Sequence, residues 1–290
     1  MKITMPRRLL AASVLALATL AAVTAPGQAQ PVAPAGRAAA AAALPGYQVM
    51  RGAAVTVDNF TRLTLSCPVG KVVVGGGGEA QGAAGVLVGS FPTLAGGSYR
   101  WNVVARQVGQ SKVTASGYAI CVDSAAMSGY QLIHLASANV ANGSSRQVSC
   151  PVGKVVVGGG AETLGSNAAL RFSLAPRPKS TDYMWTASGQ SLSGSTTVGL
   201  AVDVICASPV AGYEIVELAA AETPNQTRRT LACPSGKTAL SGGVSGYNTA
   251  VVTSTLPEYS STGYGWTTTV REPSRPNAIS GVTAVCANFA

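Results

Sequence analysis

The sequence contains little that is charged, aromatic or able to act as an acid or base near neutral pH. Of its 290 residues, 11% are charged and 6% are aromatic, and His134 is its one histidine. An ordinary soluble domain has about 25% charged residues. A single histidine excludes histidine-rich zinc sites and most histidine-paired nucleophiles. We therefore do not expect an enzyme, and we assign no metal and no cofactor.

The first 29 residues have the features of a secretory signal peptide. Basic residues at positions 2, 7 and 8 precede an apolar run from Leu9 to Val23, and small residues end at Ala29. The run is shorter than the about 20 residues of a membrane-spanning helix. Residues 30–45 are rich in alanine and proline and are expected to form a flexible tether, with a short helix in the alanine tract as the alternative. The predicted location is extracellular, with no membrane-spanning segment.

Three copies of one unit make up the rest of the chain. Gly-Tyr opens each copy at residues 46, 129 and 212, a constant step of 83. A Cys-Pro-x-Gly-Lys motif, a short apolar run with a pair or triplet of glycines, a Tyr-x-Trp motif and a second cysteine then follow in the same order. Repeats of this kind indicate an architecture built from similar units. We place the units at residues 46–128, 129–211 and 212–290.

Within a unit the apolar pattern has a period of two. Apolar residues alternate from Arg62 to Cys67, which is typical of a strand with one buried face. Further strands are predicted at residues 47–57, 72–74, 86–91, 99–106 and 113–122. We expect an all-β fold of three tandem units of about 83 residues, each a small disulfide-closed sandwich or barrel. A linear row of units and a pseudo-threefold arrangement both fit the sequence.

The six cysteines lie at matching positions, two in each unit. In an exported protein, oxidised pairs are the expected state, and no C-x-x-C spacing suggests a metal site. Each loop closed in this way should stabilise its unit by about 4 kcal/mol. The repeat favours the pairs Cys67–Cys121, Cys150–Cys206 and Cys233–Cys286.

The Tyr-x-Trp motifs are the candidate ligand-binding residues. Two residues apart on a strand, the rings share a face. Facing outward they could stack on sugar rings or on a partner's apolar surface, and facing inward they would fill a small core, which is the favoured interpretation for tryptophan. The six residues are Tyr99, Trp101, Tyr183, Trp185, Tyr264 and Trp266.

Other candidate sites are weaker. His134 corresponds to Arg51 and Glu217 in the other units, which suggests a solvent-facing strand position. The glycine runs follow a lysine and precede no helix, so they do not form a phosphate loop. An Asn-x-Ser/Thr sequence recurs at Asn59, Asn142 and Asn225. We interpret it as an Asx-type turn, made by the asparagine and the hydroxyl two residues on, that starts a strand, in preference to a glycosylation site.

Acidic residues and charge add little. The sequence leaves open a catalytic pair of carboxylates drawn from four residues, Asp123, Glu162, Asp182 and Asp203. None of the four belongs to a repeated acidic motif. The net charge of +9 is spread along the chain, without the clustered lysine and arginine of a nucleic-acid binder. A diffuse excess of this kind can favour anionic surfaces such as wall polymers.

The order Cys-Pro-x-Gly-Lys, Gly-Gly, Tyr-x-Trp and Cys resembles repeat units of secreted bacterial proteins, over nearly all of residues 46–290. The resemblance implies export and β-structure, and no activity. We expect a secreted, non-enzymatic protein that recognises a glycan or cell-surface polymer through three like surfaces. The alternative is a structural or protein–protein component of a secreted assembly, including an inhibitor of another secreted protein.

Overall fold

Almost every described residue of this protein belongs to a β-strand or to a turn between strands. The computed structural model describes residues 44–174, 181, 183–260 and 263–289, which together form one compact body. These residues form nineteen strands and one short 3-10 helix, Ser124–Ala126. The expected all-β fold is confirmed. The predicted signal peptide and residues 30–43 of the predicted tether lie outside the described residues.

The strands repeat in the same order in each unit. Unit 1 contains β1 (Gln48–Arg51), β2 (Val55–Asp58), β3 (Arg62–Ser66), β4 (Lys71–Gln81), β5 (Gly85–Ala95), β6 (Ser98–Gln107) and β7 (Lys112–Asp123). Unit 2 contains β8 (Gln131–Ala141), β9 (Ser145–Ser149), β10 (Val155–Leu164), β11 (Ala168–Leu174), β12 (Met184–Ser191) and β13 (Thr197–Ala207). Unit 3 contains β14 (Glu214–Pro224), β15 (Arg229–Leu231), β16 (Lys237–Gly246), β17 (Val251–Ser260), β18 (Gly263–Arg271) and β19 (Asn277–Asn288).

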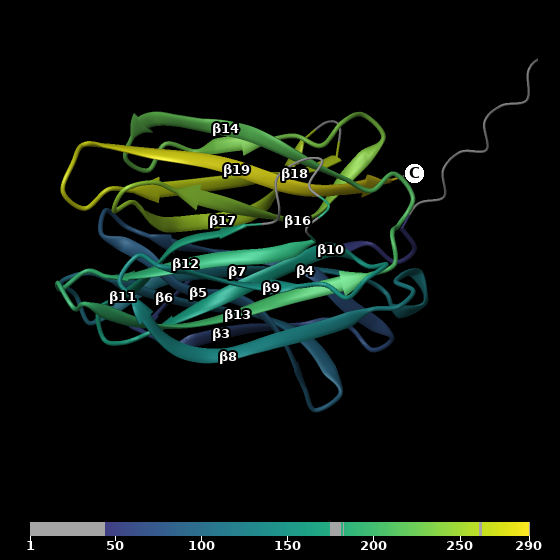
Figure 1. The fold of residues 1–290 in the computed structure, drawn as a ribbon, viewed down its shortest axis with the longest axis horizontal. Helices are drawn as coiled ribbons and strands as arrows, with labels where there is room; N and C mark the ends of the chain where they lie inside the picture. Colours follow the sequence, from purple (N-terminus) through teal and green to yellow (C-terminus); the bar gives the residue numbers. More distant parts are fainter. Residues whose placement is uncertain (1–43, 175–180, 182, 261–262, 290) are drawn as a thin grey trace, which may run out of the picture. The chain divides into compact units, whose positions relative to one another are not determined.

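The strands of the described chain lie together in one body (Figure 1). Each of the three sheets is shared between two units. Sheet A joins β1, β2, β7 and β4 of unit 1 to β17, β18 and β15 of unit 3. Sheet B joins β3, β6 and β5 of unit 1 to β10, β13 and β8 of unit 2. Sheet C joins β9, β12 and β11 of unit 2 to β16, β19 and β14 of unit 3. The units therefore interlock in a closed pseudo-threefold ring, the arrangement that the repeat left undecided.

The pseudo-threefold axis passes between β4, β10 and β16. Each of these strands has a bulge near its start, and the residue after the bulge is Gly75, Gly158 or Ser241. A Cβ atom on Gly75 would lie 2.2 Å from the carbonyl oxygen of Leu240, and one on Gly158 would lie 2.0 Å from that of Val74. Ser241 donates a hydrogen bond to the carbonyl oxygen of Val157 at 2.7 Å. Only small residues fit here because the three backbones approach so closely.

The predicted cysteine pairs are confirmed. Cys67 bonds to Cys121, Cys150 to Cys206 and Cys233 to Cys286. In each pair the first cysteine follows a strand of one sheet and the second lies in a strand of another sheet. The disulfides consequently link sheet A to B, B to C and C to A, and such bonds are typical of proteins from an oxidising compartment.

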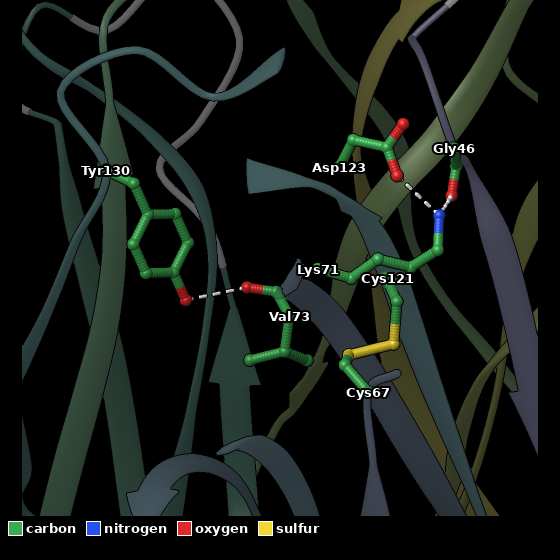
Figure 2. The surroundings of a disulfide bond; sticks show 7 residues. All are labelled: Gly46, Cys67, Lys71, Val73, Cys121, Asp123 and Tyr130. Carbon is green, nitrogen blue, oxygen red and sulfur yellow. Dashed lines mark hydrogen bonds and ion pairs between the residues drawn. A yellow bond between two sulfur atoms is a disulfide. The ribbon is translucent and has the colours of Figure 1, made fainter. Parts of the chain in front are cut away.

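The opening tyrosine of each unit binds the neighbouring unit. Tyr130 of unit 2 donates its hydroxyl to the carbonyl oxygen of Val73 in unit 1 at 2.7 Å, as Figure 2 shows. Its counterparts Tyr47 and Tyr213 donate to Ala239 and Val156, at 2.7 and 2.9 Å. All three acceptors lie directly beside the axial bulges, so the ladder carbonyls disturbed by the bulges find partners across the unit boundary.

The lysine of each Cys-Pro-x-Gly-Lys motif holds the opening of its own unit. Lys71 donates to the Gly46 carbonyl at 2.7 Å and to the Asp123 carboxylate at 2.6 Å (Figure 2). Lys154 donates to the Gly129 carbonyl at 2.6 Å. Lys237 pairs with Glu214 at 3.0 Å. The motif is therefore a structural joint.

Candidate functional site

The three tryptophans of the Tyr-x-Trp motifs lie inside the core. Trp101, Trp185 and Trp266 are 1%, 1% and 0% exposed. Each ring lies against a glycine of the glycine run, and each indole N–H donates to a hydroxyl, of Ser90, Ser173 or Thr255, at 2.8–3.0 Å. A large ring that is also hydrogen-bonded suits a thin core. The inward-facing interpretation of the tryptophans is therefore confirmed. The prediction that they stack on a ligand is wrong, because no face of their rings is open to a sugar.

The tyrosines of these motifs lie at the boundaries between units. Tyr99 packs edge-on against Tyr130 with ring centroids 5.0 Å apart, and Tyr183 and Tyr264 contact Tyr213 and Tyr47 at 6.2 and 6.0 Å. Burial raises the pKa of Tyr130 well above its usual value, and the neighbouring Tyr99 raises it further. The half-buried tyrosines thus join the units, and the motif that we proposed for binding is part of the scaffold.

His134 lies on β8, an edge strand of sheet B. The His134 side chain is 59% exposed, and its Nδ1 atom lies 2.8 Å from Oδ1 of Asp203, whose side chain is 3% exposed. Burial raises the pKa of Asp203 to about 6, although the hydrogen bond from His134 lowers it, and the nearby Glu162 raises it again. Asp123 pairs with Lys71 instead, and Asp182 lies outside the described residues.

The repeated Asn-x-Ser/Thr segments position a site that the sequence did not reveal. Asn59 donates to the carbonyl oxygens of Gln107 and Gln110 and accepts from the Gln107 N–H, which ties its turn to the β6–β7 hairpin. Asn225 holds the β18–β19 hairpin in the same way. A turn at these positions is confirmed. Its Asx-type form is wrong for Asn59 and Asn225, because the side chains of these asparagines bond to a distant hairpin and not within their own turn.

The residue after each asparagine has a left-handed backbone. In unit 2 it is Gly143, with a φ of 80°, and in unit 3 it is Gln226, with a φ of 64°. In unit 1 it is Phe60, with a φ of 69° and 41% of its surface exposed. A bulky residue in this region is strained, and strain of this kind concentrates at functional sites.

Phe60 borders a groove where β5 of unit 1 pairs with β10 of unit 2, which we call the unit 1–2 groove. Its volume is about 400 Å³. The buried side chains of Val88 and Val104 form its floor, and Phe60 and the 46% exposed Leu164 flank it. Glu162, Thr163, Gly165 and Ser166 complete the lining. An apolar hollow of this size with a few polar groups is typical of a small-ligand site.

An ion pair between the two units lies at the groove. Arg62 of unit 1 donates Nη2 to both carboxylate oxygens of Glu162, at 2.8 and 3.1 Å. The side chain of Arg62 is 50% exposed and that of Glu162 is 20% exposed, so both can also reach a ligand. The Arg62 guanidinium lies over the ring of Phe91 at 5.0 Å, and the Arg106 guanidinium lies over the ring of Phe60 at 5.6 Å.

The two other junctions carry different residues at these positions. Between units 2 and 3, Arg171 and Ser188 replace the two floor valines, and both donate to the Gly143 carbonyl. Between units 3 and 1, the floor residues are Thr253 and Thr269, which are hydrogen-bonded to each other. An apolar floor beside an exposed aromatic ring therefore belongs to the unit 1–2 junction and is not a property of the repeat.

Within the described chain, no cluster of three or more histidine, cysteine, aspartate or glutamate residues could hold a metal ion. No helix among the described residues is long and apolar enough to cross a membrane. A search of protein families and a search of curated proteins find no match to this chain.

Proposed function

We propose that this is a secreted, non-enzymatic binding protein that recognises a glycan or cell-surface polymer in the unit 1–2 groove. The observation that carries the proposal is Phe60, an exposed aromatic ring held in a strained backbone conformation beside an apolar floor and a charged pair. Strain persists where the surrounding structure imposes it, and at this position unit 2 has the unstrained glycine.

The chemistry of the groove fits a sugar ring. A pyranose has an apolar face of C–H groups and a rim of hydroxyls. Phe60 offers a ring for the apolar face, and the Arg62–Glu162 pair offers donors and acceptors for neighbouring hydroxyls. The described part of the chain forms one such groove. Multivalent binding would then come from several chains on one polymer, and not from three like surfaces on one chain.

Export supports this function. The basic start, apolar run and small-residue end of residues 1–29 are typical of a signal peptide, and three disulfides suit an oxidising compartment. A polymer outside the cell would meet the folded, oxidised protein.

The test compares the wild-type chain with Phe60→Gly and Phe60→Gln on a glycan array and in polysaccharide pull-downs. These variants install the residues of units 2 and 3. We expect both to bind about tenfold more weakly or worse, and Phe60→Gly to be at least as stable as wild type because the strain is relieved. Tyr259→Ser, which removes a 70% exposed ring on β17, is the control and should keep binding. Full binding by Phe60→Gly would refute the unit 1–2 groove as the binding site. If the wild-type chain binds no glycan, a glycan is not the ligand.

A protein–protein role is the second candidate because of two exposed turns. Val69 and Val152 lie at corresponding positions and are fully exposed, at 102% and 104%, whereas unit 3 has Ser235 there. Exposed apolar groups can mark contact surfaces. The double variant Val69→Ser/Val152→Ser should keep glycan binding under the groove proposal, and should lose a partner from a secreted assembly under the alternative.

A further inference from the structure

An apolar cluster with polar side chains around it lies near the turns that connect β4 to β5, β10 to β11 and β16 to β17. At the start of β5, β11 and β17 stand Val86, Ala169 and Val251, each 0% exposed. These three side chains form a small apolar cluster separate from the main core, with Val108 and Leu192 packed on it. One residue from each unit thus lies at the pseudo-threefold axis. In unit 1 this residue is next to the turn of the β4–β5 hairpin, at the end of β4 away from the bulge at Val73 and Gly75.

Each of these three residues has a polar residue directly opposite it on the neighbouring strand. Val86 pairs with Arg106, Ala169 with Gln190 and Val251 with Arg271. Directly opposite residues of an antiparallel pair lie on the same face of the sheet. Two guanidinium groups and one carboxamide therefore flank the axial cluster, one from each unit.

Two of these side chains reach the next unit's turn. Arg106 donates to the Ser166 carbonyl at 2.7 Å, and Gln190 donates to the Thr249 carbonyl at 2.7 Å. At the third boundary, Gln226 donates to the carbonyl oxygens of Gly82 and Ala83, at 3.1 and 3.2 Å. The corresponding turn is therefore already bound by another side chain, and Arg271 is not needed to hold it.

Both arginines retain donor capacity. The Nε atoms of Arg106 and Arg271 are buried without an acceptor. Two other arginines, Arg100 and Arg171, share this feature among the described residues, but they do not occupy this repeated axial position. A buried donor without an acceptor is costly, and an ion is one of the ordinary ways to satisfy it.

The charges of the cluster favour an anion. Burial lowers the pKa of Arg271, the Arg106 guanidinium lowers it further, and Glu272 opposes both effects. Glu272 is itself engaged, since it accepts from the Thr249 N–H at 3.2 Å, from the Thr249 hydroxyl and from the Ser274 hydroxyl. Two guanidinium groups against one carboxylate leave a positive excess.

We propose that Arg106, Gln190 and Arg271 form an axial oxyanion site that takes a carboxylate, sulfate or phosphate group. Guanidinium groups bind planar or tetrahedral oxyanions through paired N–H donors, and an amide N–H adds a third donor from unit 2. The proposal stands apart from the glycan proposal. Arg106 also borders the unit 1–2 groove through Phe60, so the test is centred on Arg271.

The experiment measures thermal unfolding and calorimetric binding of the full chain with inorganic sulfate and phosphate. Sodium chloride holds the ionic strength constant, because surface charges respond to any salt. We expect sulfate or phosphate to raise the melting temperature above the chloride control. Arg271→Gln, which installs the residue of unit 2, should weaken binding about tenfold and should melt higher than wild type without oxyanion because the repulsion from Arg106 is gone.

Arg275→Gln is the matched control, since Arg275 is exposed and lies in the loop that follows β18. It should keep the oxyanion response. An equal response in wild type and Arg271→Gln, or no response beyond chloride in wild type, would overturn the site. A sulfated polysaccharide compared with its unsulfated parent then shows whether the anion is free or attached to a polymer. Wild-type binding of the sulfated polymer that is lost in Arg271→Gln indicates an attached anion, and binding of the inorganic ions alone indicates a free one.

Discussion

The repeated contacts around the disulfides and the faces at the three unit junctions follow different rules. Around the disulfides the three units make corresponding contacts: an opening tyrosine binds a neighbour's carbonyl, a lysine holds the start of its own unit, and a disulfide links two sheets. At the junction faces the units differ. The floor consists of two valines between units 1 and 2, of an arginine and a serine between units 2 and 3, and of two threonines between units 3 and 1. Repetition here marks the scaffold, and departure from the repeat marks the candidate site.

This difference changes how the repeated aromatics are understood. The sequence draws attention to Tyr-x-Trp because it recurs three times, yet recurrence follows from the need of each unit for the same core and the same joint. Phe60 attracts no attention by itself, but its counterparts are Gly143 and Gln226. A binding site made once in a threefold scaffold must lie where one unit departs from the others.

The largest expected effect is on the scaffold side of the comparison. Trp185→Ala removes a fully buried ring and leaves the Ser173 hydroxyl without its partner. We expect a loss of about 3–5 kcal/mol in the free energy of unfolding. Tyr259→Ala, at an exposed position, should stay within about 0.5 kcal/mol of wild type. Urea unfolding measures both, and equal stability of the two variants would break the distinction between scaffold and surface.

A smaller effect is expected at Asp203. Its pKa of about 6 in the folded protein lies above the ordinary value of 3.8, because burial disfavours the charged form. The folded state therefore holds the proton more tightly, and stability that is present below pH 4 is lost as the pH rises through about 6. Asp203→Asn should gain about 1–2 kcal/mol over wild type at pH 8 and nothing at pH 4.

Urea unfolding at the two pH values measures this gain. Asp58→Asn is the control, since the side chain of Asp58 is 78% exposed. A gain of the same size at both pH values, or the same gain in Asp58→Asn, would mean that burial of the Asp203 charge is not the cause.

Much of the fold could be predicted from the repeat. Matching positions identify the cysteine pairs, and alternation identifies strands, because both depend on local chemistry. Which sheets the strands join could not be predicted. Ala161 pairs with Ser90 across a unit boundary, and nothing in either segment specifies that its partner strand lies in another unit.

The candidate site was less predictable than the fold. Its floor depends on Val88, the extra residue of a bulge in β5, and its ion pair joins Arg62 to Glu162, 100 positions along the chain. The one available signal was the comparison of the units position by position. That comparison isolates Phe60, a bulky residue where unit 2 has a glycine.

The central structural claim is that the three units are one interlocked body, and calorimetry of Tyr130→Phe tests it most directly. This variant removes one hydroxyl that joins unit 2 to unit 1 and leaves the Val73 carbonyl unpaired, at a cost of about 1 kcal/mol. We predict one unfolding transition that moves to lower temperature as a whole. A low-temperature peak that separates from an unshifted one would show instead that the units unfold independently.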